Sequence, residues 1–162
     1  MIVSVKEQKT NAMRILDQKK IKYTPHEYSH GGEAVDGITA AASIGRDPKS
    51  VFKTLVARGA SKTNYVFVIP VSNELELKKA AKAVGEKSVA MLPLSELTAL
   101  TGYVRGGCSP IGMKKLFRTI IDSSALEQEN IIFSAGKIGA QIECAPADLA
   151  AVIKGSFADV ID

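Results

Sequence analysis

The sequence has no tryptophan, two histidines and two cysteines. Cys108 and Cys144 form neither a CxxC pair nor a multi-cysteine framework, which excludes a disulfide-rich scaffold and a cysteine-based zinc site and leaves a lone disulfide open. His26 and His30 would share one face of a strand, but no third cluster of ligand residues accompanies them. We therefore expect neither a metal nor any other cofactor.

Long apolar runs are also missing. A run such as residues 66–71 falls far short of the roughly 20 residues that cross a bilayer. The apolar stretch Met1–Val5 is too short for the core of a signal peptide, and charged residues follow it at once. These absences predict a cytoplasmic protein with no membrane partner.

The composition that is present is typical of a globular domain. The chain has 162 residues, of which 46% are apolar and 23% charged. No linker or internal repeat is visible, so we expect a single domain over residues 1–162. The formal net charge is +4. This charge favours anionic partners and permits RNA binding without establishing it.

The order of the expected elements indicates the α+β class. Apolar periodicity and capping residues predict helices over residues 10–19, 39–44, 74–84 (capped by Asn73), 95–101 and 146–153. Branched and aromatic runs predict strands over 21–30, 51–58, 65–71, 88–92, 116–121, 130–134 and 140–144. The strands 51–58 and 65–71 should form a hairpin, and the second is apolar enough to be covered on both faces. Several connections are too short for helical crossovers, so the sheet should be mixed.

A glycine-rich loop over residues 102–112 is the most informative segment. Glycine lets successive backbone N–H groups converge on a carbonyl oxygen or a phosphate. A tight connection between a helix and a strand fits equally well, because the loop matches neither a Walker A nor a dinucleotide motif. Cys108 and Ser109 lie in this loop without a GxSxG motif, so we favour structural roles for both. A base role beside them for His26 or His30 stays open.

Lys53 is a charged residue inside an otherwise apolar strand. Alternation places it on the same face as Val51, Leu55 and Ala57. Its ammonium group must therefore reach a strand edge or meet an anion in a cleft, and the pattern alone favours the edge.

Four motifs together resemble one family in order and spacing. They are Phe52-Lys53-Thr54-Leu55, Leu77-Lys78-Lys79-Ala80-Ala81, the loop segment 106–112, and Gly136-Lys137-Ile138-Gly139 with Pro146-Ala147-Asp148-Leu149. The family is that of YbaK and EbsC, which are Cys-tRNA(Pro) deacylases related to the editing domain of prolyl-tRNA synthetase. The resemblance extends from the first helix to Phe157. It implies a single editing domain with a mixed β-sheet that curls into a pseudo-barrel flanked by helices.

The resemblance also implies roles for particular residues. It places the family's key lysine at Lys53, an aromatic residue at Tyr28 and the loop glycines at Gly106 and Gly107. The expected catalytic set is Lys53, Gly106 and Gly107, and the expected substrate-binding set is Tyr28, Thr54, Cys108, Ser109, Pro110, Ser134, Gly136 and Asp148. Two positions depart from the family pattern, since Ala135 stands where glycine is frequent and Gln141 where serine can occur.

The implied activity is hydrolysis of the ester that joins cysteine to the terminal adenosine of proline tRNA. We expect the thiol of the attached cysteine to attack its own ester, while the amides of residues 106–109 stabilise the oxyanion and Lys53 binds the adenosine end or its phosphate. Prolyl-tRNA synthetase is the expected transient partner. Two alternatives stay open: a deacylase for another small amino acid such as alanine, using an activated water, and a module that binds aminoacyl or nucleotide ends without hydrolysis.

Overall fold

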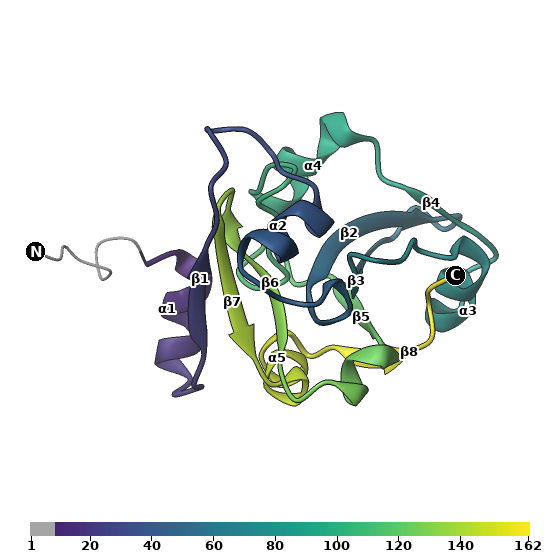
Figure 1. Cartoon of the computed structure of the whole chain (residues 1–162). Helices are drawn as coiled ribbons and strands as arrows, with labels where there is room; N and C mark the ends of the chain where they lie inside the picture. The colour runs from purple at the N-terminus through teal and green to yellow at the C-terminus, as the bar shows by residue number, and fades with distance from the viewer. Residues whose placement is uncertain (1–8) are drawn as a thin grey trace, which may run out of the picture.

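A computed structural model describes residues 9–162 of the chain (Figure 1). The stretch Met1–Val5, from which we argued against a signal peptide, lies outside the described residues. The elements are α1 (Asn11–Gln18), β1 (Thr24–Glu27), α2 (Gly37–Ser43), η2 (Pro48–Ser50), β2 (Phe52–Gly59), β3 (Asn64–Pro70), α3 (Leu77–Val84), β4 (Val89–Met91), α4 (Leu94–Thr101), β5 (Arg118–Asp122), η3 (Ser123–Glu127), β6 (Ile131–Lys137), β7 (Ala140–Cys144), α5 (Pro146–Ile153) and β8 (Ser156–Ala158).

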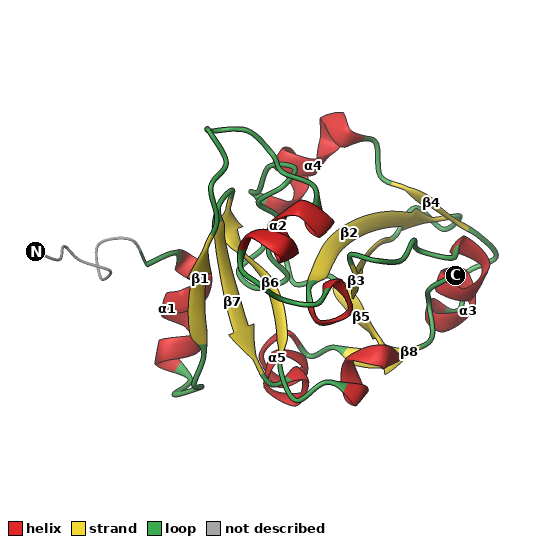
Figure 2. Ribbon diagram, in the orientation of Figure 1, coloured by secondary structure: helices red, strands yellow, loops and turns green. Residues whose placement is uncertain are grey.

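The strands form two sheets (Figure 2). One has the order β1-β7-β6 and is antiparallel, whereas the other has the order β4-β2-β3-β5-β8 and contains both parallel and antiparallel pairs. An isolated parallel bridge between Val51 and Ile132 joins them. This arrangement confirms the α+β class, the mixed pairing and the hairpin of β2 with β3. Closure of one curled sheet into a pseudo-barrel is not seen and stays a prediction.

The main core lies between the two sheets. Phe52, Val56 and Val66 of the larger sheet share a buried cluster with Phe133 and Ile142 of the smaller one, and α1 and α5 add apolar residues to it. The opposite face of β3 packs against α3 in a second cluster. Strand β3 is therefore buried on both faces, as its continuous apolar run predicts.

The structure corrects the predicted start of α3. The helix begins at Leu77 with Glu76 as its N-cap, rather than at Glu74 with Asn73 as the cap. Leu75 pairs instead with Ile161 in an isolated antiparallel bridge, and the side chain of Asn73 donates to Asp162. These long-range contacts hold the preceding segment extended, which the local sequence pattern does not reveal.

The first strand is shorter than predicted. The extended segment 21–30 contributes only β1, because the Ile21 amide still donates to Leu16 at the end of α1. The pairing of β1 with β7 stops at Glu27 opposite Ala140, where β7 begins. The C-terminal strand β8, parallel to β5, was not predicted.

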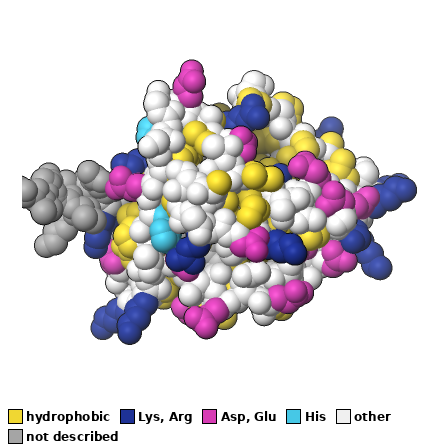
Figure 3. Space-filling view, viewed as in Figure 1, with side chains coloured by type: hydrophobic (Ala, Val, Ile, Leu, Met, Phe, Trp, Pro, Cys, Tyr) yellow, Lys and Arg dark blue, Asp and Glu magenta, His cyan; other side chains and the backbone are white. Residues whose placement is uncertain are grey.

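Figure 1 shows α1 outside β1 at one end of the molecule, α3 beside the C-terminus at the other end, and α2 between β7 and β2. On the face seen in Figure 3, hydrophobic side chains gather near the middle, and charged side chains lie mostly toward the outline. Within residues 9–162, no helix has the length and apolar character needed to cross a membrane.

Candidate active site

A cavity of about 700 Å³ opens between the two sheets, beside α2 and the glycine-rich loop. Predicted site residues from several elements line it, including the lysine of β2 and the first glycine of the loop. The predicted site residues at its wall are Tyr28, Lys53, Thr54, Gly106, Cys108 and Ser134. The structure thus brings Lys53 and the loop to one cavity.

The edge of β2 forms one wall of this cavity. Strand β2 pairs with β3 along its whole length but with β4 only from Ala57 to Gly59. The half from Phe52 to Val56 is therefore not covered by β4, and all five of its residues line the cavity. Incomplete pairing at a sheet edge leaves room for a ligand beside the strand.

Lys53 lies at the rim of the cavity. Its Nζ is 3.3 Å from Oε2 of Glu74, and its side chain is 30% exposed whereas that of Glu74 is 80% exposed. An ion pair with so exposed a partner stabilises the fold little, so the ammonium group can exchange Glu74 for an anionic ligand. Lys53 has features of both predicted environments. Its side chain reaches the edge of the strand, and that edge borders the cavity.

Tyr103 fixes the glycine-rich loop in place. Its hydroxyl donates to the carbonyl of Ile111 at 2.5 Å, and burial raises the pKa of this phenol to about 12. A Cβ on Gly136 would lie 3.0 Å from the Tyr103 ring, and one on Gly112 would lie 2.9 Å from its hydroxyl. These two glycines therefore leave space for the tyrosine that anchors the loop.

Two further glycines bring the loop against its neighbours. Gly106 has a φ of +84°, and a Cβ there would lie 2.7 Å from the Cβ of Ala34. A Cβ on Gly107 would lie 2.9 Å from the amide nitrogen of Ile138. Each close approach requires a residue without a side chain.

The amides of the predicted oxyanion donors differ in their hydrogen bonding. The Gly107 amide donates to the carbonyl of Val104 at 3.0 Å, so its hydrogen already has an acceptor within the loop. Within residues 9–162, the amides of Gly106 and Cys108 have no acceptor among the backbone and side-chain contacts. Both residues also line the cavity, so their two amides stay as candidate oxyanion donors.

Cys108 and Ser109 have the surroundings of structural residues. Cys108 is 8% exposed and Ser109 is fully buried. Burial raises the pKa of the Cys108 thiol to about 12, so its reactive thiolate is nearly absent at neutral pH. The hydroxyl oxygen of Ser109 accepts from the Ile111 amide at 3.2 Å. Neither side chain is prepared for nucleophilic attack.

Replacing Cys108 with alanine should therefore leave most of any hydrolytic activity intact. We expect kcat/KM to change by less than about threefold, since only about one thiol in 10⁵ ionises at pH 7 when its pKa is near 12. The measurement is single-turnover hydrolysis by the two proteins at equal concentration, with thermal unfolding as the control for folding. An inactive, fully folded C108A variant would show that this thiol takes part.

Several predicted site residues lie away from the cavity wall. Gly107, Ser109, Pro110, Gly136 and Asp148 are not among its lining residues. Pro110 lines a separate cavity of about 120 Å³. Asp148 lies in the first turn of α5, where a carboxylate stabilises the helix end without a catalytic role.

Two cavity residues were not assigned a role by the sequence. Arg105 lies on the exposed part of the loop and adds a second cation to the lining of the cavity that contains Lys53. Gln141 of β7 is 7% exposed and lines the same cavity. The sequence signal for a role of Gln141 was an amide side chain between two apolar residues of a strand, because a buried amide normally needs a hydrogen-bond partner.

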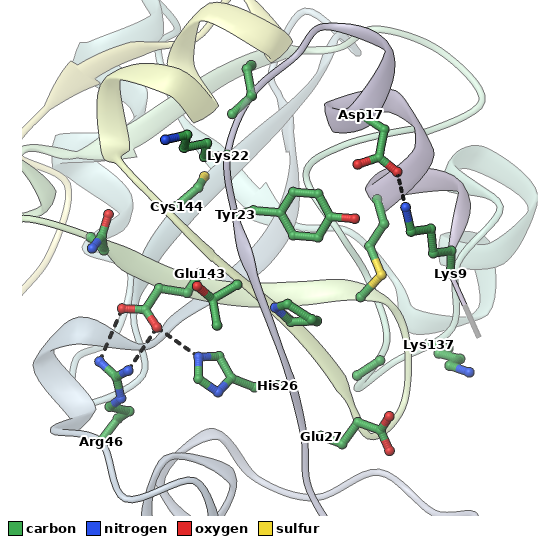
Figure 4. A pocket seen from close by; sticks show the side chains of 16 residues that line it. Lys9, Asp17, Lys22, Tyr23, His26, Glu27, Arg46, Lys137, Glu143 and Cys144 are labelled. Atoms are coloured by element: carbon green, nitrogen blue, oxygen red, sulfur yellow. Dashed lines mark hydrogen bonds and ion pairs between the residues drawn. The ribbon is translucent and has the colours of Figure 1, made fainter. Parts of the chain in front are cut away.

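A second cavity, of about 1050 Å³, lies along β1 (Figure 4). Its charged side chains are largely paired with one another. His26 Nε2 lies 2.8 Å from Glu143 Oε1, and the Arg46 guanidinium donates to both oxygens of the same carboxylate at 3.1 and 2.9 Å. Lys9 forms an ion pair with Asp17 at 2.6 Å. None of the predicted site residues lines this cavity.

The histidines do not join the loop cysteine and serine. His26 lines the second cavity, and Nδ1 of His30 accepts from the Gly32 amide at 2.8 Å. Neither ring lines the cavity that contains Cys108. In the part of the chain that the structure describes, no group of three or more His, Cys, Asp or Glu residues could hold a metal ion.

Comparison with known proteins gives the class of this domain. The family model of the aminoacyl-tRNA editing domain matches residues 33–152. Because the match spans most of the sequence, the chain belongs to this family. It is similar to EbsC of Enterococcus faecalis, whose name assigns it Cys-tRNA(Pro) and Cys-tRNA(Cys) deacylase activity. The two are 47% identical over 154 residues, which cover 95% of this chain and 94% of EbsC.

Solved structures share the fold. One, named as a trans-editing enzyme for prolyl-tRNA synthetase, has a TM-score of 0.81 and 22% identity over 99% of both chains. Another, a hypothetical protein, has a TM-score of 0.82 and 21% identity over 92% of this chain and 97% of the other. At these identities the likeness extends to the architecture alone.

Proposed function

We propose that the chain is a trans-editing enzyme that hydrolyses Cys-tRNA(Pro) in the 700 Å³ cavity. The observation that carries this proposal is the shared cavity of Lys53 and the loop residues Gly106 and Cys108, in a chain of the aminoacyl-tRNA editing family. An acceptor end offers an anionic phosphate and an ester carbonyl a short distance apart. The cavity offers a cation and unpaired backbone amides that suit these two groups.

The reaction begins with the substrate's own thiol. The sulfur attacks the ester carbonyl, a carbon–sulfur bond forms, and the bond to the terminal ribose oxygen breaks as that oxygen takes up the proton that the thiol loses. Water then opens the resulting thiolactone to free cysteine. Proximity within the substrate can supply part of the rate enhancement. No protein nucleophile is needed, in agreement with the burial of Cys108.

Protein groups position the ester and stabilise its charge. The amides of Gly106 and Cys108 donate to the oxyanion, and a preorganised donor of this kind contributes roughly 10²–10³ in rate. Lys53 binds the phosphate of the terminal adenosine, with Arg105 as a second cation on the loop. Editing is required because one small group in a pocket separates two amino acids by only about 1–3 kcal/mol.

The proposal extends to partners and compartment. A small domain of modest charge contacts mainly the acceptor end, so it selects one tRNA only weakly. A transient complex with prolyl-tRNA synthetase would supply that selectivity, and the name of the solved structure supports this partner. We assign the enzyme to the cytoplasm, where aminoacyl-tRNA is made. The whole chain acts as one editing domain in this account.

Hydrolysis of proline tRNA charged with cysteine, alanine or serine tests the substrate. We expect cysteine to be released about 100-fold faster than serine, because the change from sulfur to oxygen removes the better nucleophile. Equal release of alanine would favour the alternative with an activated water. Binding of all three tRNAs without release of any amino acid would favour a non-catalytic module and contradict the proposal.

A further inference from the structure

Two buried polar atoms at the cavity have no hydrogen-bond partner among the residues that the structure describes. They are Oγ1 of Thr54 and Oε1 of Gln141. Gln141 is more than nine-tenths buried, at 7% exposure. Buried polar atoms almost always have a partner, and an unpartnered one destabilises the fold. Their presence at one cavity, on strands of different sheets, indicates that a ligand supplies the missing donor.

The fold fixes Gln141 at this position. It lies in β7, the central strand of the smaller sheet, opposite His26 of β1 and Ser134 of β6. Neighbouring side chains already have other partners, since His26 contacts Glu143 and the Ser134 oxygen accepts from the Gly136 amide at 3.1 Å. Gln141 lines the cavity, and within residues 9–162 its side-chain oxygen is a buried acceptor without a donor, on the central strand of the smaller sheet.

The charges around the cavity indicate which ligand group these acceptors bind. Asp36 is the acidic residue among the lining residues. Both of its carboxylate oxygens accept from Thr39, at 2.9 Å from the amide and 2.8 Å from the hydroxyl. A cationic group that enters the cavity must therefore share Asp36 with Thr39, whereas the oxygens of Gln141 and Thr54 have no competing donor within residues 9–162.

We infer that Gln141 and Thr54 bind the α-ammonium group of the esterified amino acid. This assignment rests on the proposed function. The phosphate of the substrate is held by Lys53 at the rim, and the ammonium group, which is a donor only, pairs with the two oxygens inside the cavity. The enzyme consequently requires a free α-amine and spares N-acylated aminoacyl-tRNA, whose amide has a single N–H and no charge.

Near-isosteric substitutions test this role. Gln141→Met and Thr54→Val remove the two acceptors with little change of volume. The wild type should prefer Cys-tRNA(Pro) over N-acetyl-Cys-tRNA(Pro) by about 30-fold in kcat/KM, and Gln141→Met should reduce this preference to about threefold. The loss should fall on the free-amine substrate, because the acetylated one does not use the ammonium contact.

Ser124→Ala is the matched control. Within residues 9–162, Ser124 Oγ is another buried side-chain atom without a partner, and Ser124 is not among the residues that line the cavity. All three substitutions remove an unpartnered polar atom, so each should keep or raise the thermal midpoint. Only the two cavity variants should lose the preference for a free amine.

Two results separate this inference from the proposed function. A Gln141→Met variant that loses activity equally on both substrates, or that keeps the full preference, overturns the ammonium contact. If the wild type hydrolyses neither substrate, the proposed function fails. The inference is then tested by the affinity of the wild type and Gln141→Met for cysteinyl 3′-amide analogues with free and acetylated amines, and equal affinities in the wild type overturn it.

Discussion

Replacing Lys53 with alanine is expected to lower kcat/KM for Cys-tRNA(Pro) by about 100-fold or more. A hydrogen bond to a charged group contributes roughly 1.5–3 kcal/mol, and loss of the cation leaves the bound phosphate without its partner. The ion pair that Lys53 makes with Glu74 is exposed, so its loss should hardly change stability. Single-turnover hydrolysis and thermal unfolding of the same preparations measure both effects.

Lys79→Ala is the control for Lys53→Ala. Lys79 also forms an exposed ion pair, with Asp159 at 3.0 Å, but it lies on α3 and does not line the cavity. This variant should keep the wild-type rate. A Lys53→Ala protein that hydrolyses at the rate of Lys79→Ala would remove Lys53 from the site.

Gly106→Ala is expected to have the second-largest effect. The added Cβ would lie 2.7 Å from Ala34, at a φ of +84° that alanine rarely adopts. The loop must move to relieve this contact, and the Gly106 and Cys108 amides move with it. A displacement of about 1 Å can cost roughly 10²-fold in rate, so we expect kcat/KM to fall by about 100-fold.

Gly85→Ala provides the matched control for the backbone strain. Gly85 has a φ of +75° at the end of α3, and a Cβ there would meet nothing within 4 Å. Both variants should lose stability through the positive φ, which can be compared by thermal unfolding. Only Gly106→Ala should lose activity. Similar activity of the two variants would contradict a role for the loop geometry.

Most elements could be predicted because their signals are local. The turn between β2 and β3 and the apolar run of β3 identify the hairpin, and Gly102 marks the end of α4. The start of α3 could not be predicted, because it depends on the bridge between Leu75 and Ile161. Strand β8 has three residues and pairs with β5 only through the tertiary fold.

The placement of the candidate site residues in the fold could be predicted only in part, for a similar reason. The family resemblance identified Lys53 and Gly106, which share the cavity. The sequence does not show that the Gly107 amide donates to the Val104 carbonyl, or that the Tyr103 ring packs against Gly136. Both contacts depend on the folded loop. The sequence marks Gln141 as a polar residue between two apolar residues of a strand and as a departure from the family pattern, whereas its missing partner appears only in three dimensions.

A crystal structure with a non-hydrolysable 3′-amide analogue of cysteinyl-adenosine 5′-phosphate tests the central claim most directly. We predict that its phosphate lies within hydrogen-bond distance of Lys53 Nζ and its carbonyl oxygen beside the Gly106 and Cys108 amides, in the 700 Å³ cavity. An analogue bound instead in the 1050 Å³ cavity along β1, with no contact to Lys53 or the loop, would contradict the account.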